Sequence, residues 1–236
     1  MPLDRTEMHA AYALPDRDAP RVRVNFVSSL DGAVTVDGRS SGLGGDDDRL
    51  VMGVLRAMAD ILVVGAGTVR VEGYGGVRLA RSNVEWRLAN GLPPTVRLAV
   101  VSASLDLDPR HPFFTEAAER PLVLAPRSAR PERREALAEV ADVVVCGDEM
   151  VEASAMLEAL AERGLTQVLC EGGPHLFGDL IDADAVDELC LTLSPTLVGG
   201  SAGRIVRGAP EAVRRMRLLH AIPSEDFVFL RYAARA

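Results

Sequence analysis

Lysine is absent from this chain of 236 residues, and all 26 of its basic residues are arginine. Without a lysine amine the protein has no Walker A phosphate loop, no Schiff-base lysine and no Ser-x-x-Lys acylation site, so several large enzyme classes are excluded. Aromatic residues are also scarce, at 4% of the sequence, and small aliphatic side chains must therefore fill most of the core. The hydrophobic fraction of 48% and the charged fraction of 25% are otherwise those of an ordinary folded protein.

Basic residues are fewer than acidic ones, 26 against 34, which gives a formal net charge of −8 at pH 7. We therefore expect neither nucleic acid nor a membrane as a partner. No apolar run approaches the ~18 residues that a bilayer-spanning helix needs, and the N-terminal stretch MPLDRTEMHAAYALPDRDAPR is rich in charges. These features predict a cytoplasmic protein in which local arginines and backbone N–H groups bind any anionic ligand.

Cysteine and histidine are few and widely spaced. An odd number of cysteines, each in apolar sequence, argues against disulfides and favours a place in the core. The histidines show no metal-ligand spacing with one another or with a cysteine, so we expect no metal site. The residues concerned are Cys146, Cys170, Cys190, His9, His111, His175 and His220.

Short, continuous apolar runs alternate with helix-like segments along most of the chain. This alternation predicts an α/β fold with right-handed βαβ units and a mostly parallel sheet covered by helices. Residues 187–200 and 226–235 resemble long strands with no helix after them, which predicts antiparallel C-terminal strands in a mixed sheet. We expect the other strands at residues 22–27, 60–64, 96–103, 120–125, 141–146 and 166–170, and helices at Asp46–Met58, Pro131–Val140, Val151–Arg163 and Pro174–Ile181.

Neither an internal repeat nor a strong linker divides the chain. The most linker-like stretch, LANGLPPTVR at residues 88–97, is typical of a loop before a strand. We therefore expect a single domain over residues 21–236, preceded by an irregular N-terminal extension over residues 1–20.

Glycine-rich or polar loops follow three of the predicted strands. They are VSSLDGAVTVDGRSSG at 27–42, VVGAGTVRVEGYGG at 63–76 and CEGGPH at 170–175. The carboxyl ends of parallel strands share one edge of a sheet, and Pro174 suits a helix start whose free N–H groups favour an anion. This pattern indicates a dinucleotide held by backbone N–H groups. Neither glycine loop matches G-x-G-x-x-G, however, and any tight strand-to-helix turn can use Gly-Gly.

Two carboxylates stand in these loops. Asp31 and Glu171 are the candidates for a proton donor, and burial in a closed site would raise the pKa of either one. Asp31 has an equally good structural explanation, because Asp-Gly is an ordinary turn pair.

The stretch GGSAG at 199–203 formally matches the nucleophile elbow of hydrolases. That motif requires a strand, a sharp turn and then a helix, whereas Ser201 precedes RIVRGAP, which has no helical pattern. We assign Ser201 to a loop and keep hydrolysis as a remote alternative.

The runs VNFVSSLDG, VVGAGTVRVEGYG and LCEGGPHLFGDLI, with DELCLTLSPTLVGG after them, resemble the pyrimidine reductase domain of riboflavin biosynthesis. The resemblance extends from about Tyr12 to the C-terminus and implies a three-layer αβα fold like that of dihydrofolate reductase. No zinc-deaminase segment of the H-x-E and P-C-x-x-C kind is seen, which indicates a stand-alone reductase.

The resemblance implies that NADPH reduces 5-amino-6-ribosylaminouracil 5′-phosphate by hydride transfer to C1′ of the opened ribose. Asp31 and Glu171 would be catalytic, and the substrate would be bound by Ser29, Ser41, Arg56 and Glu171, with Arg56 suited to a phosphate. Ser102 and Ser104 would bind the cofactor's 2′-phosphate, assisted by Arg127. The remaining cofactor-binding positions would be Val27, Gly65, Thr68, Glu72, Gly172, Gly173, Pro174, His175, Leu176 and Phe177.

Some positions depart from the family pattern. Glu72 stands where an aspartate is usual, Gly73-Tyr74 replaces the customary turn, and Leu43 replaces an aromatic residue. Reduction of dihydrofolate or a dihydropterin is therefore an alternative, as is a non-catalytic dinucleotide-binding protein. Similar reductases are dimers, which implies a homodimer here.

Overall fold

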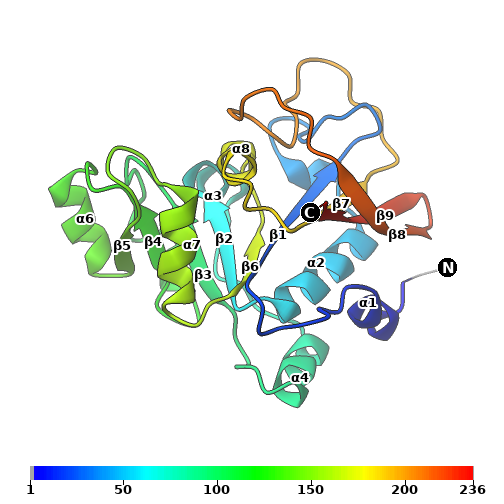
Figure 1. Cartoon of the computed structure of the whole chain (residues 1–236), viewed down its shortest axis with the longest axis horizontal. Coiled ribbons are helices and arrows are strands. Elements are labelled where there is room, and N and C mark those ends of the chain that lie inside the picture. Colours follow the sequence, from blue (N-terminus) through cyan, green and yellow to red (C-terminus); the bar gives the residue numbers. More distant parts are fainter. Residues whose placement is uncertain (1–2, 236) are drawn as a thin grey trace.

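The computed structural model describes residues 3–235. Its strands are β1 (Arg21–Ser28), β2 (Ile61–Gly65), β3 (Arg97–Val101), β4 (Leu122–Ala125), β5 (Asp142–Val145), β6 (Gln167–Cys170), β7 (Glu188–Leu193), β8 (Met216–Ser224) and β9 (Phe227–Ala234). They form one sheet in the order β5-β4-β3-β2-β6-β1-β7-β9-β8 (Figure 1). All pairs from β5 to β7 are parallel, whereas β9 runs antiparallel to both β7 and β8. The predicted mixed sheet with antiparallel C-terminal strands is confirmed.

Helices cover both faces of this sheet. They are α1 (Arg5–Ala11), α2 (Asp46–Met58), α3 (Ala66–Glu72), α4 (Arg81–Ala89), α5 (Pro112–Thr115), α6 (Pro131–Ala138), α7 (Ala153–Ala161) and α8 (Pro174–Asp182), with a 3₁₀ turn at Ser40–Gly42. One core lies under α7 and α8, and α7 is seen in front of the sheet in Figure 1. A second core lies between the other face and helices that include α1, α2, α3, α5 and α6. The predicted three-layer architecture is therefore confirmed.

Helix α2 shows how the sequence specifies these layers. Three aspartates occupy its first turn, where negative charge is favoured by the helix dipole. Its buried residues, spaced three and four apart, form an apolar stripe toward the sheet. They include Val51, Val54, Leu55 and Met58.

The predicted helices are all present, within two residues at each end, and so are the parallel strands. Strand β8 and helices α3, α4 and α5 were not predicted. The prediction of a strand across residues 187–200 is wrong beyond Leu193, because the chain there enters a long loop that ends only at β8.

The prediction of an irregular N-terminal extension is also wrong. Residues Arg5–Ala11 form α1, which begins at the capping side chain of Asp4, and Met8 and Tyr12 are buried in a core. Further along, the Gln167 side chain donates hydrogen bonds to the carbonyl oxygens of Arg17 and Ala19. Residues 3–20 therefore pack as part of the same structure.

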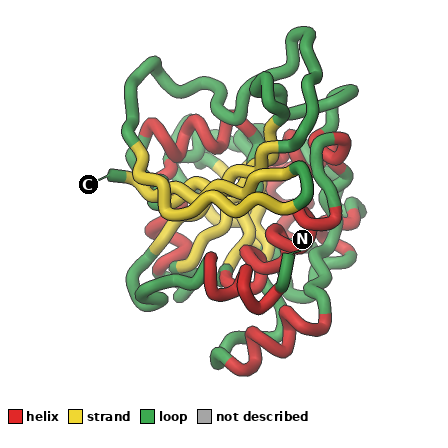
Figure 2. The backbone as a smooth tube through the Cα atoms, turned by 90° about the vertical axis from the view of Figure 1, so that its right-hand side faces the viewer, coloured by secondary structure: helices red, strands yellow, loops and turns green. Residues whose placement is uncertain are grey.

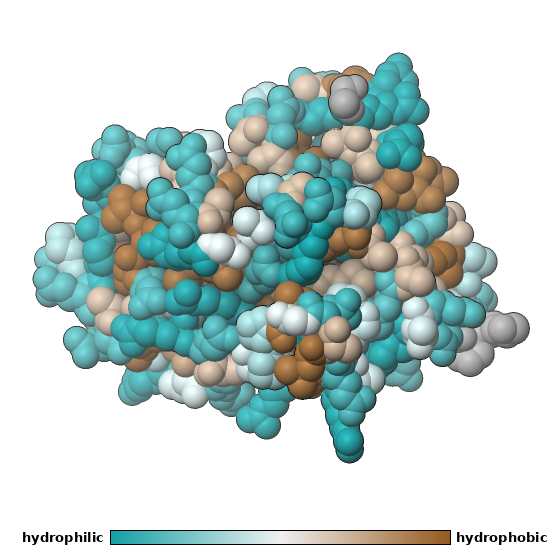
Figure 3. Space-filling view, turned by 60° about the horizontal axis from the view of Figure 1, so that its bottom comes forward, coloured by the Kyte–Doolittle hydropathy of each residue, from teal (hydrophilic) through white to brown (hydrophobic). Residues whose placement is uncertain are grey.

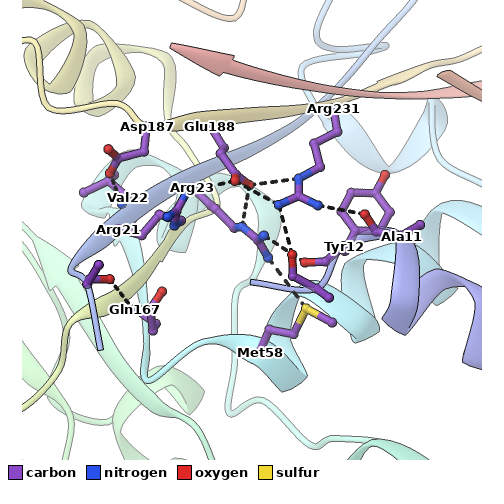
Figure 4. Close-up of polar contacts among 12 residues, drawn as sticks. Ala11, Tyr12, Arg21, Val22, Arg23, Met58, Gln167, Asp187, Glu188 and Arg231 are labelled. Carbon is purple, nitrogen blue, oxygen red and sulfur yellow. Dashed lines mark hydrogen bonds and ion pairs between the residues drawn. The ribbon is translucent and has the colours of Figure 1, made fainter. Parts of the chain in front are cut away.

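A cluster of charged residues joins this N-terminal segment to the sheet (Figure 4). The Glu188 carboxylate, on β7, is 2.7 Å from Arg23 Nε, 2.8 Å from Arg231 Nη2 and 3.1 Å from Arg21 Nη1. Arg23 also donates to the carbonyl oxygen of Tyr12 at 2.8 Å. The side chains of Glu188, Arg23 and Arg231 are at most 7% exposed, so this cluster lies in the interior.

On the face drawn in Figure 3, hydrophobic residues form several areas that are separated by hydrophilic ones. Within residues 3–235, no helix has the length and apolar character to cross a membrane. The three cysteines are buried and free, as the sequence predicts.

Candidate active site

The order β2-β6-β1 places the carboxyl ends of these three strands side by side. Gly65 N donates to Gly172 O at 2.8 Å, and Glu171 N donates to Val63 O at 3.0 Å, so the end of β2, from which α3 begins, is hydrogen-bonded to the loop after β6. The predicted convergence of the glycine loops at one edge of the sheet is therefore confirmed.

Backbone approaches backbone closely where these loops meet. A Cβ atom on Gly65 would lie 3.3 Å from the nitrogen of Gly173, and one on Gly173 would lie 3.0 Å from Thr68 Oγ1. Gly172 has a φ of +89°, which favours glycine. Gly173 is the N-cap of α8 and Pro174 is its first residue. The free N–H groups at the N-terminus of α8 therefore lie beside these glycines and form a cradle with them. A cradle of this kind fits the anionic part of a dinucleotide.

A cavity of about 680 Å³ opens beside the cradle, between α3 and the start of α8. We call it the first cavity. Its volume lies within the range of sites that bind small molecules. Nine of the predicted cofactor-binding residues line it: Gly65, Thr68, Glu72, Ser102, Ser104, Gly173, Pro174, His175 and Leu176.

A second cavity, of about 350 Å³, adjoins the first. Asp48, Met52 and Arg56 line it at four-residue intervals, which places one face of α2 along its wall. It is also lined by four residues that were predicted to bind substrate or cofactor, Val27, Ser41, Glu171 and Gly172. The walls shared by the two cavities are Val34, Thr35, Thr68, Glu72, Gly173 and Pro174.

Glu171 is held firmly at the end of β6. It accepts hydrogen bonds from Arg56 Nε and Nη2, both at 2.7 Å, and from the Tyr74 hydroxyl at 2.6 Å. Burial lowers the pKa of Arg56, but the charge of Glu171 and the hydrogen bonds to it outweigh burial and raise this pKa above its usual value. Burial and the charge of Glu171 raise the pKa of Tyr74 well above its ordinary value. Arg56, predicted to bind the substrate phosphate, lines the second cavity, and its Nε and Nη2 form a bidentate ion pair with Glu171 there. Phosphate binding by Arg56 therefore stays a prediction.

Tyr74 was not predicted as a site residue. It belongs to the EGYGG sequence that departs from the family pattern, and through Tyr74 this sequence contributes to the second cavity. The Tyr74 ring lies against Arg56, with 5.6 Å between the guanidinium carbon and the ring centroid. Glu72, expected to contact the cofactor, accepts a hydrogen bond at 2.8 Å from the backbone N–H of Ser40. The loops after β1 and β2 are joined by this contact.

Asp48 is a second residue that sequence reasoning missed. It lines the second cavity, and burial raises the pKa of its carboxyl group, a rise opposed by a hydrogen bond from the Thr192 side chain. Its position is crowded, since a Cβ atom on Gly44 would lie 2.8 Å from Asp48 Oδ2. A carboxyl group with a raised pKa in a cavity is a typical feature of functional sites.

Asp31 lies outside both cavities, and its proposed role as a buried proton donor is wrong. Hydrogen bonds from the Ser29 hydroxyl and from the backbone N–H groups of Gly199 and Val198 lower its pKa to about 2. An exposed carboxyl group with this pKa is ionised at neutral pH and has no proton to donate. Ser29, predicted to bind substrate, instead donates to Asp31 and accepts from the N–H of Ala33 at 2.8 Å.

Two further predictions are corrected by the structure. Phe177 lines neither cavity and stacks on Phe26, with ring centroids 5.3 Å apart. Arg127 pairs with Asp148 at 3.1 Å and does not line the first cavity. The prediction that Ser201 lies in a loop is confirmed: it falls between β7 and β8, and no helix follows it before β8, so the context of a nucleophile elbow is missing.

Comparison with known proteins identifies the family to which this chain belongs. Residues 20–226 match the model of the RibD C-terminal domain. This chain belongs to that family. RibD-like proteins share its fold: a pyrimidine reductase-like protein from Corynebacterium diphtheriae, of known structure, is 27% identical and superposes with a TM-score of 0.87, covering 97% of this chain and 98% of that one.

Two relatives carry names that describe a reaction or pathway. The 2,5-diamino-6-ribosylamino-4(3H)-pyrimidinone 5′-phosphate reductase of Archaeoglobus fulgidus is 30% identical over 84% of this chain and 91% of its own length. The riboflavin biosynthesis protein RibD of Mycobacterium tuberculosis is 31% identical over 77% of this chain and 44% of its own length. The resemblance to riboflavin-biosynthesis reductases is thereby confirmed.

Proposed function

We propose that this protein is an NADPH-dependent reductase of a ribosylaminopyrimidine 5′-phosphate in riboflavin biosynthesis. The observation that carries the proposal is the pair of adjoining cavities at the β2-β6-β1 edge. A dinucleotide in the first cavity and a pyrimidine in the second would meet at the shared residues Thr68, Gly173 and Pro174.

When NADPH is bound, it supplies the hydride that reduces C1′ of the opened ribose. Gly172, Gly173 and the N-terminus of α8 would hold its anionic part. Glu171, fixed by Arg56 and Tyr74, would accept hydrogen bonds from N–H groups of the substrate. Arg49 also lines the second cavity and is a further candidate for the 5′-phosphate. Its ion pair with Asp46 is exposed, with 65% of the Arg49 side chain accessible, whereas the pair of Arg56 with Glu171 is largely buried.

Asp48 bears on which pyrimidine ring the substrate carries. A 2-amino-4-oxopyrimidine presents two adjacent N–H donors, which one carboxylate can accept together, whereas uracil presents a carbonyl oxygen at C2. Asp48 in the second cavity therefore favours the 2,5-diaminopyrimidinone over the aminouracil that the sequence resemblance implies.

Reduction of a dihydropterin or dihydrofolate is a second candidate function. A pterin has the same 2-amino-4-oxo edge and no phosphate. The bidentate pairing of Arg56 with Glu171 favours this candidate, since it offsets the charge of one arginine that a phosphate would need.

An NADPH oxidation assay would test both candidates. The diaminopyrimidinone phosphate, the aminouracil phosphate and dihydrofolate would be compared, with NADH as the control cofactor. We expect the diaminopyrimidinone phosphate to be reduced fastest, with NADPH. Turnover of dihydrofolate alone would favour the second candidate, and NADPH binding without any turnover would indicate a non-catalytic dinucleotide-binding protein.

Asp48→Asn should shift the ring preference. We expect binding of the 2-amino substrate to weaken by about 10- to 100-fold, because two charge-assisted hydrogen bonds are lost, with a much smaller effect on the uracil analogue, whose C2 oxygen can accept from the new amide. The measurement is the Kd of each compound by calorimetry. Asp47→Asn, in the same helical turn but in neither cavity, is the control. Equal weakening for both rings would contradict this role of Asp48.

The proposal includes a homodimer in the cytoplasm. Leu191, Leu193, Leu230 and Tyr232 share one face of β7 and β9 by register, are half-buried and belong to neither core. Figure 2 shows the antiparallel strands in front, with the helices behind or beside them. A second chain packing on this face would bury these side chains. A single-chain molar mass by light scattering would contradict the dimer.

A further inference from the structure

The loop between β7 and β8 is seated closely on helix α8. The backbone N–H of Arg207 donates to the carbonyl oxygen of Pro174 at 3.0 Å. A Cβ atom on Gly178 would lie only 2.0 Å from the carbonyl oxygen of Arg207, so the loop can approach the helix only where that side chain is missing. Gly203, further back in the loop, accepts at 3.3 Å from the N–H of Val34. The loop therefore bridges α8 and the loop after β1.

This seating brings Arg207 to the first cavity. Arg207 and Gly203 line the cavity together with Gly173, Pro174 and His175 at the N-terminus of α8. Within residues 3–235, no carboxylate forms an ion pair with the Arg207 guanidinium, and its side chain makes no hydrogen bond there. Arg70, another arginine of this cavity, donates to the carbonyl oxygen of Asp106.

We propose that Arg207 binds the pyrophosphate of the dinucleotide and that Gly178 is the positioning residue that lets it do so. The inference rests on the proposed use of NADPH. A pyrophosphate carries two negative charges, and the N–H groups of α8 supply only partial positive charge, so a full cation beside them adds the missing neutralisation. In a protein with no lysine, this cation must be an arginine, and of the two arginines that line the cavity Arg207 is the one whose guanidinium group has no hydrogen bond to another described residue, whereas Arg70 donates to Asp106.

Arg207→Gln tests the proposal through binding, measured as the Kd of NADPH and of NADH by calorimetry. Both cofactors contain the pyrophosphate, and only NADPH contains the 2′-phosphate. We expect both Kd values to rise by the same factor, about tenfold. Arg204→Gln is the matched control, because Arg204 lies in the same loop but does not line the first cavity. A larger loss for NADPH than for NADH would assign Arg207 to the 2′-phosphate and overturn the proposal, as would equal Kd values for the two variants.

Gly178→Ala tests the positioning role separately. Alanine suits the interior of a helix better than glycine, so α8 itself should not be weakened, but the new methyl group must displace the loop at Arg207. We expect dinucleotide binding to weaken by about the same factor as in Arg207→Gln, and the double variant to be no worse than either single one. Additive losses would show that the two residues act independently. If the unchanged protein bound neither NADPH nor NADH, the proposed function itself would fail, which is a different outcome from any of these.

Discussion

Replacing Glu188 by alanine is expected to lower the free energy of unfolding by about 3–5 kcal/mol. The carboxylate is 2% exposed and accepts hydrogen bonds from Arg21, Arg23 and Arg231. Its removal would leave arginine side chains buried without a counter-charge, and Arg23 and Arg231 also hold backbone carbonyl groups of the N-terminal segment. Urea unfolding would measure the loss. A matched control is Glu85→Ala, whose exposed pair with Arg81 should contribute only about 0.5 kcal/mol or less.

The contribution of Glu188 should also depend on pH. Burial alone would raise its pKa, but the hydrogen bond from Arg231 and the charges of Arg23 and Arg231 lower the pKa below its ordinary value. A carboxyl group whose pKa is lower in the folded state stabilises the protein above the unfolded-state pKa, and this stabilisation is lost as the pH falls through the folded-state value. The difference in stability between the unchanged protein and Glu188→Gln should therefore be full at neutral pH and shrink in acid. A difference independent of pH would contradict an electrostatic role.

The parallel part of the fold could be predicted from the sequence because its signals are local. Each buried strand is a continuous apolar run, and β6 is buried at every residue. Strand β8 was missed because it is an edge strand with mixed polarity and contains Pro223. The short helices α3 and α5 lack the several turns over which an apolar stripe becomes visible in a sequence.

In the candidate site too, features that depend on residues near in sequence could be predicted, and features that depend on distant residues could not. The glycines after β2 and β6 were predicted because their role depends on neighbouring backbone. The hydrogen-bond partners of Asp31 and Arg56 could not be predicted because they are distant in sequence, Gly199 being 168 residues from Asp31 and Glu171 being 115 residues from Arg56. Asp48 was missed because three successive aspartates are typical of the start of a helix, and only packing shows that one of them faces a cavity.

Glu171→Ala is expected to reduce kcat/KM by about two orders of magnitude or more while changing the Kd of NADPH little. Glu171 lines the second cavity and not the first, so its carboxylate would act on the substrate and not on the dinucleotide. Its loss would also free Arg56, whose side chain is only 18% exposed, to bind other groups or to distort the site. Steady-state kinetics and direct cofactor binding measure the two quantities separately. Equal losses in both would contradict a role on the substrate.

A structural explanation for the same loss can be distinguished by removing both members of the ion pair. In Glu171→Ala, the stability should fall because a largely buried guanidinium group loses its partner, and in the double variant with Arg56→Ala this unpaired charge is gone. We expect the double variant to recover part of the stability lost in the single variant, without recovering turnover. If turnover returned together with stability, Glu171 would serve only to neutralise Arg56. If turnover stayed lost while Arg56→Ala alone remained active, the carboxylate itself would be needed by the reaction.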